Sequence, residues 1–360
     1  MPATIHVLRQ IDVGDSVHLE RVTRMLDERE LSRGTTVLRR ADETSSGGVV
    51  LRREPLDLKL GQVTAGPFTA DARARLFEFG VVALRFTFAA PDGSAASLID
   101  LSHRLGRESG AFDAKARELW DKLGARIKDA VVPWEDEAAT ELMEDFTVFV
   151  LPNVVESEIG VERAFAHLLL GEPANRKLAA SVVSDIWRRA IRYYEDDLVL
   201  VDYDTAIVVD KDEATENVDI FEIASAQLLE LRFYDAMLGR SLEGLLADVR
   251  RARTAVWFFR SPFRRLARRA AILALELGEL NDRLERAITL VGDTYSAQIY
   301  RETALRFRLP PSGESVREKV EMIGRISELL GHEIHSRRDL VLEMLVLLLI
   351  AIEVVIAFRP

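Results

Sequence analysis

The sequence contains no cysteine among its 360 residues. A chain without cysteine has no disulfide framework, no thiolate zinc site and no cysteine nucleophile. The 48 lysines and arginines are outnumbered by 59 aspartates and glutamates, which gives a net charge of −11. This acidic balance argues against nonspecific nucleic-acid binding over the whole surface. Apolar residues make up 48% of the chain and charged residues 30%, so we expect a folded protein.

Motifs of known chemistry are missing as well. The sequence has no G-x-G-x-x-G, no Walker loop, no G-x-S-x-G and no H-E-x-x-H. Acidic residues crowd residues 195–213, but their spacing matches no EF-hand, and we interpret them as solvated protection of a sheet edge. Residues 1–15 lack the basic and apolar regions of a secretory signal. The sequence therefore predicts no catalytic residue, no cofactor, no metal ligand and no export signal.

The first 212 residues predict an α+β fold. Strand character is found at residues 4–13, 48–53, 56–63, 76–88 and 146–151. Helical periodicity is found at residues 94–105, 112–131, 161–170 and 176–194. Two short apolar runs, 198–201 and 206–209, predict a hairpin. We divide this part into a small α+β segment, residues 1–72, and an α+β domain, residues 73–212.

Long helices are predicted after residue 212. Apolar residues at three- and four-residue steps run from Phe221 to Val256 and again from Leu266 to Val291. Such spacing is typical of a coiled coil, and it predicts an antiparallel helical hairpin with a third helix over residues 213–338. Asp235 interrupts the first apolar stripe. We expect its carboxylate to pair with the Arg283–Arg286 turn and to set the register, unless local rotation exposes it.

The apolar tail, residues 339–358, is the strongest single signal. Residues 340–358 contain only two charged residues, Glu343 and Glu353, and a helix over them would be about 28 Å long, close to the thickness of the bilayer hydrocarbon. We expect a transmembrane tail anchor, with Arg337 and Arg338 holding the body on the cytoplasmic side. Glu343 would then lie near the interface, and Glu353 would serve helix–helix contact, unless it snorkels or stays neutral against an apolar partner. The alternative is a soluble oligomer in which the tails pack together.

An arginine-rich stretch marks the predicted tip of the hairpin. It has two interpretations: a patch for anionic lipid headgroups or RNA phosphate, or a solvated tip whose arginines pair with neighbouring acids. A tail in the bilayer cannot also stay packed against this tip, because several arginines would then enter hydrocarbon. The candidate residues of the patch are Trp257, Arg260, Phe263, Arg264, Arg265, Arg268 and Arg269.

Several segments resemble the required-for-meiotic-nuclear-division proteins, domain-of-unknown-function family 155. They are YYEDDLVLVDYDTAIVVD (193–210), RFYDAMLGR (232–240), RSPFRRLARR (260–269), LVGDTYSAQIYRETALRFRLP (290–310) and RRDLVLEMLVLLLIAIEV (337–354). The likeness covers roughly residues 75–358. It implies a C-terminal membrane helix with acids at positions like 343 and 353, and homo-oligomers. It implies no catalytic residues.

These observations lead to a membrane-anchored, homo-oligomeric scaffold without catalysis and with a protein partner of unknown identity. Nucleic acid is expected as a partner only through the arginine-rich tip. Two alternatives stay open. One is a soluble helical oligomer with buried apolar tails. The other is an enzyme or nucleotide binder with an unrecognised site in the α+β domain.

Overall fold

The computed structural model describes residues 3–27, 30–32, 48–51, 54–90, 92–134, 142–153, 159–211, 215–254, 288–291 and 295–357. The chain divides into two compact units. The first consists of Met1–Phe233 and Leu284–Ser312, and the second of Tyr234–Arg283 and Gly313–Pro360. The long helix α6 (Thr215–Thr254) therefore contributes to both.

An eight-stranded sheet forms the centre of the first unit, with the order β10-β11-β9-β1-β7-β6-β5-β3. All neighbouring strands are antiparallel except β9 and β11. A parallel pair needs a long crossover, and α4 (Val161–Leu169) and α5 (Ala180–Trp187) lie in this connection. The strands are β1 (Thr4–Asp12), β3 (Leu31–Ser32), β5 (Leu56–Ala65), β6 (Phe68–Leu76), β7 (Val81–Ala89), β9 (Met143–Leu151), β10 (Leu198–Val201) and β11 (Thr205–Val209).

The α+β expectation for this part of the chain is confirmed, and one sheet contains strands from both predicted N-terminal segments. The hairpin predicted from the two short apolar runs is also confirmed, because β10 and β11 pair antiparallel from Leu198↔Val209 to Val201↔Ala206. Strand β1 lies inside the sheet, between β7 and β9. Its residues are buried from Ile5 to Asp12, as expected of a strand with neighbours on both sides.

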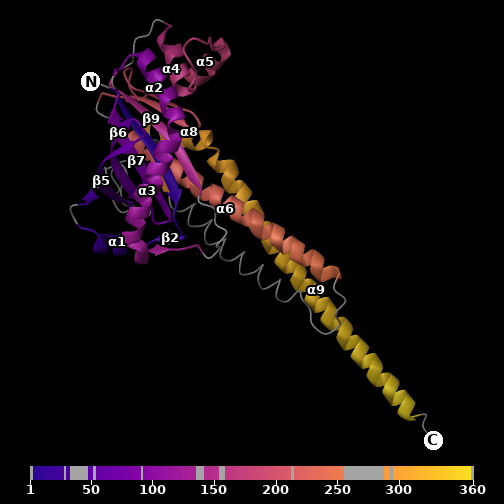
Figure 1. Ribbon diagram of the computed structural model, residues 1–360. Coiled ribbons are helices and arrows are strands. Elements are labelled where there is room, and N and C mark those ends of the chain that lie inside the picture. The colour runs from indigo at the N-terminus through magenta and orange to yellow at the C-terminus, as the bar shows by residue number, and fades with distance from the viewer. Residues whose placement is uncertain are drawn as a thin grey trace. The chain divides into compact units, whose positions relative to one another are not determined.

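One face of the sheet packs on helices. Ile5 and Val7 of β1 and Phe86 of β7 belong to a buried apolar cluster that includes α2 (Ala95–Arg107), α3 (Ser109–Ile127) and α4. Phe86 meets Phe112 of α3 edge to face, with ring centroids 5.4 Å apart. Figure 1 shows α3 lying across the strands. Apolar burial of this extent is the main source of stability for such a layer.

The other face packs on the first part of α6. All residues of α6 from Asn217 to Leu231 are buried, including the charged side chains of Asp219 and Glu222. Phe221 packs on Phe146 of β9 with ring centroids 5.6 Å apart. A helix buried on all sides must find partners for its polar groups, and here arginines of the sheet supply them for Asp219 and Glu222.

Two smaller sheets and short helices complete the first unit. In the smaller sheets, β2 (Ser16–Val17) pairs with β8 (Val131–Val132), and β4 (Gly48–Leu51) pairs with β12 (Ile288–Val291). The short helices are α1 (Leu19–Met25), the 3-10 turn η1 (Lys128–Ala130) and α8 (Tyr295–Arg306).

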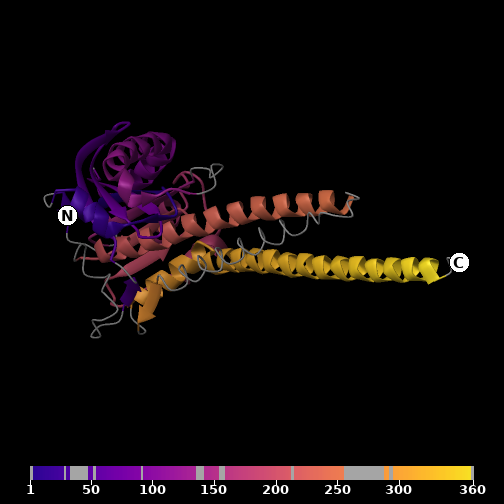
Figure 2. The ribbon, with the colours of Figure 1, turned by 90° about the horizontal axis from the view of Figure 1, so that it is seen from below.

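The second unit contains the later part of α6 and most of α9 (Leu309–Ala357). These two stretches run side by side, as Figure 2 shows, and Lys319 of α9 bonds to Asp235 of α6. Helix α9 starts at Leu309-Pro310-Pro311, where a missing backbone N–H costs little. It continues without a break through the third predicted helix and the apolar tail.

The prediction of a C-terminal transmembrane helix, and with it that of a membrane tail anchor, is wrong. Within the described residues, no helix has the length and apolar character that a membrane crossing requires. The apolar residues form the end of the 49-residue helix α9, not a separate helix. Glu343 and Glu353 interrupt them, and one acid at a bilayer centre costs about 2.5–3.5 kcal/mol.

Candidate functional site

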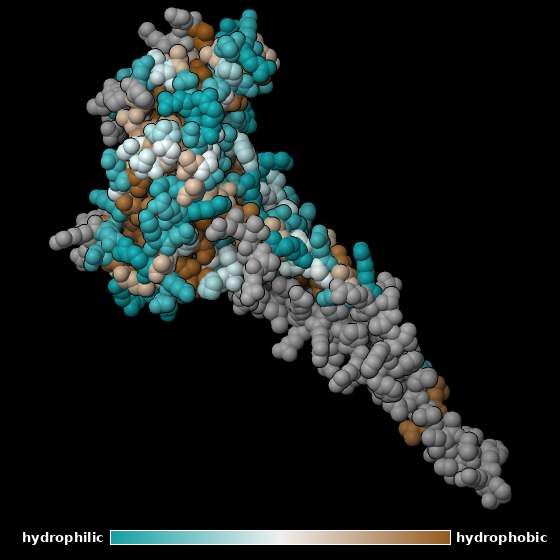
Figure 3. Space-filling model, in the orientation of Figure 1, coloured by the Kyte–Doolittle hydropathy of each residue, from teal (hydrophilic) through white to brown (hydrophobic). Residues whose placement is uncertain are grey.

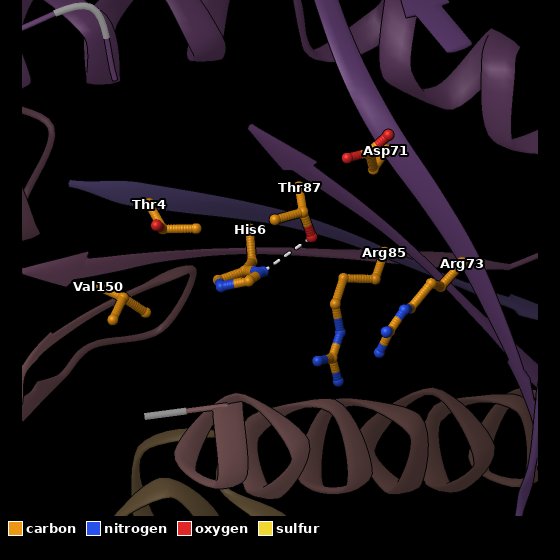
Figure 4. A pocket seen from close by; sticks show the side chains of 7 residues that line it. All are labelled: Thr4, His6, Asp71, Arg73, Arg85, Thr87 and Val150. Carbon is orange, nitrogen blue, oxygen red and sulfur yellow. Dashed lines mark hydrogen bonds between the residues drawn. The ribbon is translucent and has the colours of Figure 1, made fainter. Parts of the chain in front are cut away.

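A polar pocket of about 280 Å³ lies in the first unit and is drawn in Figure 4. Strands β1, β6, β7 and β9 contribute to it. On each of the first three strands the lining residues are two apart, so they share one face of the sheet. This is the face on which α6 packs. The lining residues are Thr4, His6, Asp71, Arg73, Arg85, Thr87 and Val150.

His6 is the buried histidine of the pocket. Its Nδ1 lies 3.0 Å from Oγ1 of Thr87, and this hydrogen bond is the dashed line in Figure 4. Burial lowers the pKa of His6 to about 3, and the positive charge of Arg85 adds to the effect. The ring is therefore neutral at physiological pH, with Nε2 as its second polar atom.

Arg85 is buried between the sheet and α6. Its Nη2 lies 2.5 Å from a carboxylate oxygen of Asp219 and 2.6 Å from one of Glu222. Burial alone would lower the pKa of Arg85, but the carboxylates of Glu222 and Asp219 raise it above its ordinary value. The charge of Arg85 is thus compensated from the helix and is not available to a ligand.

Arg75 extends this buried network toward the edge of the sheet. Its Nε and Nη2 donate to the two carboxylate oxygens of Asp57 at 2.6 and 2.8 Å. Its Nη1 lies 2.8 Å from Glu222 and 3.0 Å from Asp219. Such bidentate pairs fix geometry as well as charge. We therefore assign the network of Asp57, Arg75, Arg85, Asp219 and Glu222 to the attachment of α6.

Asp71 and Arg73 are the charges of the pocket that have no partner. Both side chains are exposed, and neither makes an ion pair or hydrogen bond within the part of the chain that the structure describes. In the register of β6 and β7, Arg73 stands opposite Arg85 and Asp71 opposite Thr87. These two charges are what the pocket offers to a bound molecule.

Asp235, the predicted polar residue of the coiled-coil stripe, lies in the second unit. Its Oδ1 accepts from Nζ of Lys319 at 2.7 Å and from Oγ of Ser315 at 2.7 Å. Burial by itself would raise the pKa of Asp235, but these two bonds lower it below its ordinary value. The Arg283–Arg286 turn that we expected as partner lies outside the described residues, so that pairing stays a prediction.

The arginine-rich patch, Trp257, Arg260, Phe263, Arg264, Arg265, Arg268 and Arg269, also lies outside the described residues, so its role stays a prediction. Glu343 and Glu353 are both in α9, and Glu343 is exposed. Close to Glu343, α9 exposes four large apolar side chains. Val346, Leu347, Leu349 and Ile350 are 52%, 56%, 61% and 52% exposed.

The acid-rich segment around the β10–β11 hairpin makes ion pairs and hydrogen bonds with the protein itself. Asp202 pairs with Arg306 at 2.9 Å, and Asp196 pairs with Lys211. The Asp197 carboxylate accepts the backbone N–H groups of Tyr193 and Tyr194 at 2.7 and 3.0 Å. Across the described ranges, no group of three or more histidine, aspartate or glutamate side chains could hold a metal ion.

Sequence reasoning missed the pocket. Its residues come from strands that are distant in sequence, and only the pairing of the strands brings them together. One signal was present: residues 68–76, FTADARARL, alternate small or apolar residues with polar ones, as a strand with one wet face does. The charged residues in this run include Asp71 and Arg73.

Comparison with known proteins gives a family. The family model described as "Uncharacterized protein MJ0711, N-terminal domain" matches residues 2–215, a range that includes every residue lining the pocket. A curated relative, uncharacterized protein MJ0711 of Methanocaldococcus jannaschii, is 27% identical over 176 residues, which are 49% of this chain and 53% of the relative. The chain thus spans about half the length of that relative. No solved structure matches the chain.

The resemblance to the required-for-meiotic-nuclear-division proteins stays a prediction beside this match, since the family model ends at residue 215 and most of the resembling segments lie beyond it. More than half of the chain is covered by the model. The chain therefore belongs to the family of the MJ0711 N-terminal domain.

Proposed function

We propose that the protein is a homo-oligomeric scaffold whose copies associate through the apolar C-terminal part of α9. The observation that carries this proposal is the exposure of Val346, Leu347, Leu349 and Ile350, each more than half exposed. A contiguous apolar patch on a helix commonly marks an interaction site. A second copy is the occupant to which we commit.

The sequence of α9 supports self-association. Glu343, Leu347 and Ile350 follow steps of four and three, and Val354 and Ala357 continue them. This spacing is the pattern of helices that pack along one another as a coiled coil. The same stretch in a second copy offers an equally apolar surface, so the contact is complementary to itself.

Burial of these side chains between two copies would favour assembly. Full burial of a large aliphatic side chain contributes roughly 1.5–3 kcal/mol, so burying the exposed half contributes about 1 kcal/mol. Four such side chains on each of two copies give about 8 kcal/mol before the costs of association. The cost of association, about 4–15 kcal/mol, offsets much of this gain, so the other apolar residues of the stretch, Val354 and Ala357 among them, must contribute as well.

A scaffold also needs a surface for its partner, and the first unit has a candidate. Tyr193 and Tyr194 are 65% and 67% exposed, and the ring of Tyr193 lies 5.8 Å from that of Tyr295. Exposed tyrosines are enriched where proteins bind one another, because the ring is apolar and its hydroxyl is polar. We assign protein partner binding to this cluster of three tyrosines.

The test is the mass of the full-length protein in solution, measured by sedimentation velocity and light scattering. We expect the unchanged chain to be larger than one copy, and the Leu347→Glu variant to shift toward the monomer. A charge in an apolar contact is strongly unfavourable, since it must be desolvated without a partner. We expect the dissociation constant to rise at least a hundredfold.

Leu305→Glu is the matched control, because Leu305 of α8 is also a leucine on a helix and is 63% exposed. This variant should keep the mass of the unchanged chain. A monomeric unchanged chain would contradict the proposal. So would a Leu347→Glu variant with undiminished mass.

A further inference from the structure

Two opposite charges face the pocket without pairing with each other. Asp71 and Arg73 are two residues apart on β6, so their Cα atoms are about 6.6 Å apart and their side chains leave the same face of the sheet. In Figure 4 the Arg73 side chain points away from Asp71 and toward Arg85. Each charge is therefore open to a different end of a bound molecule.

The groups around these charges add little net charge. The guanidinium of Arg85 is compensated by Asp219 and Glu222. The His6 ring is neutral and is oriented by Thr87, and Thr4 adds a second hydroxyl. The pocket thus has a positive end, a negative end and neutral hydrogen-bonding groups.

We propose that this pocket binds a small zwitterion of amino-acid chemistry, with its carboxylate on Arg73 and its ammonium on Asp71. The planar guanidinium suits a carboxylate because two N–H groups can donate to its two oxygens. An ammonium donates up to three hydrogen bonds, and a carboxylate accepts them. The pocket volume of about 280 Å³ is near the lower end of the range for ligand sites.

The remaining lining residues determine which other chemical groups the ligand can have. Thr4, Thr87 and Nε2 of His6 can hydrogen-bond a polar substituent. Val150 of β9 offers an apolar contact to an aliphatic part. A simple anion suits the pocket less well, because it would leave Asp71 unpaired and would be repelled by its charge.

The experiment is a titration of the full-length protein by calorimetry with glycine, β-alanine and γ-aminobutyrate. This series increases the distance between the two charges of the ligand. Acetate and methylammonium serve as probes that carry one charge each. We expect at least one of the zwitterions to bind tenfold or more tightly than either probe.

Substitutions then assign each charge to its residue. Asp71→Asn and Arg73→Gln should each weaken binding of that zwitterion at least tenfold. Asp71→Asn should not weaken acetate, because acetate does not need Asp71. Both residues are exposed and have no partner among the residues that the structure describes, so both variants should fold as the unchanged protein does, which circular dichroism can check. Arg107→Gln, an exposed arginine of α2 that does not line the pocket, is the control and should bind as the unchanged chain does.

Three results would overturn the proposal. One is a failure of all three zwitterions to bind. Another is zwitterion binding that both substitutions leave unchanged, since the site would then lie elsewhere. The third is acetate binding as tight as that of every zwitterion, because the pocket would then be an anion site. None of these results depends on assembly through α9.

Discussion

Two side chains of β1 have ionisation equilibria that burial moves in opposite ways. His6 stays neutral, with its pKa lowered to about 3 by burial. Asp12 is buried too, and burial raises its pKa to about 7 although Trp134 Nε1 donates to its carboxylate at 2.8 Å. In both cases burial disfavours the charged form of the group.

These shifts predict opposite contributions to stability. As the pH falls below 6.5, the histidine takes up a proton in the unfolded chain but not in the folded one. The contribution of His6 to the free energy of unfolding is therefore full above pH 6.5 and is lost as the pH falls from about 6.5 to 3. Folded Asp12 keeps a proton that the unfolded chain releases above pH 3.8, so its contribution is present at low pH and lost as the pH rises through 7. Between pH 4 and 6.5 the two groups change the free energy of unfolding in opposite directions, so their pH dependences partly cancel.

Asp12→Asn isolates the second effect. The variant lacks the carboxyl group, so its free energy of unfolding should rise relative to that of the unchanged chain between pH 4 and pH 8. A pKa of about 7 against 3.8 corresponds to a relative rise of about 4 kcal/mol. Urea unfolding at several pH values measures this difference. Parallel pH curves for the two proteins would contradict the shifted pKa.

The buried network at Arg85 gives a second prediction at this scale. Arg85→Met leaves Asp219 and Glu222 in the interior with one guanidinium, that of Arg75, in place of two. Removing one partner of a buried ion pair typically costs 3–5 kcal/mol, and we expect a loss of about that size.

Arg73→Met is the matched control, since Arg73 stands opposite Arg85 on the next strand but has no ion pair within the described residues. Its effect on the unfolding free energy should stay within about 0.5 kcal/mol. Thermal or urea unfolding of the two variants gives the comparison. Equal losses would show that the network does not attach α6 to the sheet.

Among the elements, those with strong periodicity could be predicted from the sequence. The alternation or apolar runs of β5, β9, β10 and β11 and the helical pattern of α2 gave segments close to the observed ones. Strand β6 was missed apart from its last residue, because three charged residues in FTADARARL lower its strand propensity while its neighbours in the sheet supply the hydrogen bonds.

The heptad pattern of α6 predicted a long helix correctly but not its surroundings. Apolar residues at three- and four-residue steps suggested one buried stripe, whereas residues 217–231 are buried on all sides. The pattern drew attention to Asp235, and it gave no sign that Asp219 and Glu222 are buried. Their partners, Arg75 and Arg85, are more than 130 residues away in the sequence. No local pattern contains such a pairing.

The turn between β6 and β7 allows a prediction about backbone geometry. Gly80 has a φ of +87°, and a Cβ there would lie 1.8 Å from the carbonyl oxygen of Gly14. Gly61 of β5 has a similar φ of +80°, but nothing lies within 4 Å of its Cβ position. Gly61→Ala therefore measures backbone strain alone, and Gly80→Ala measures strain plus a clash with backbone.

We expect Gly61→Ala to cost about 1–2 kcal/mol of unfolding free energy. Gly80→Ala should cost clearly more, on the order of 4 kcal/mol, because backbone atoms must shift. Urea unfolding of the two variants tests the order. A Gly80→Ala variant as stable as Gly61→Ala would mean that the turn can open without loss.

For the whole molecule, the proposed assembly makes Glu343 an unfavourable residue. It is exposed and stands on the same spacing as Leu347 and Ile350. If copies pack along this stretch, their carboxylates come close together and lose water. Glu343→Leu should then lower the dissociation constant about tenfold or more.

Glu318→Leu is the comparison variant, because Glu318 is an exposed acid nearer the start of α9 and away from the apolar patch. Sedimentation equilibrium at several concentrations gives both constants. A Glu343→Leu variant that assembles no more tightly than Glu318→Leu would speak against contact at this stretch.

Figure 3 shows apolar side chains on the described part of α9 near its C-terminal end.

The place of β1 in the sheet order has a consequence for how the protein is made. Strand β1 leaves the ribosome before both of its neighbours in the sheet, Val81–Ala89 and Met143–Leu151. Synthesis must therefore pass residue 151 before the nascent chain can cover both edges of β1. Until then, one edge of an apolar strand stays open to other chains, and slow translation or a shortage of chaperones should lower the yield of native protein.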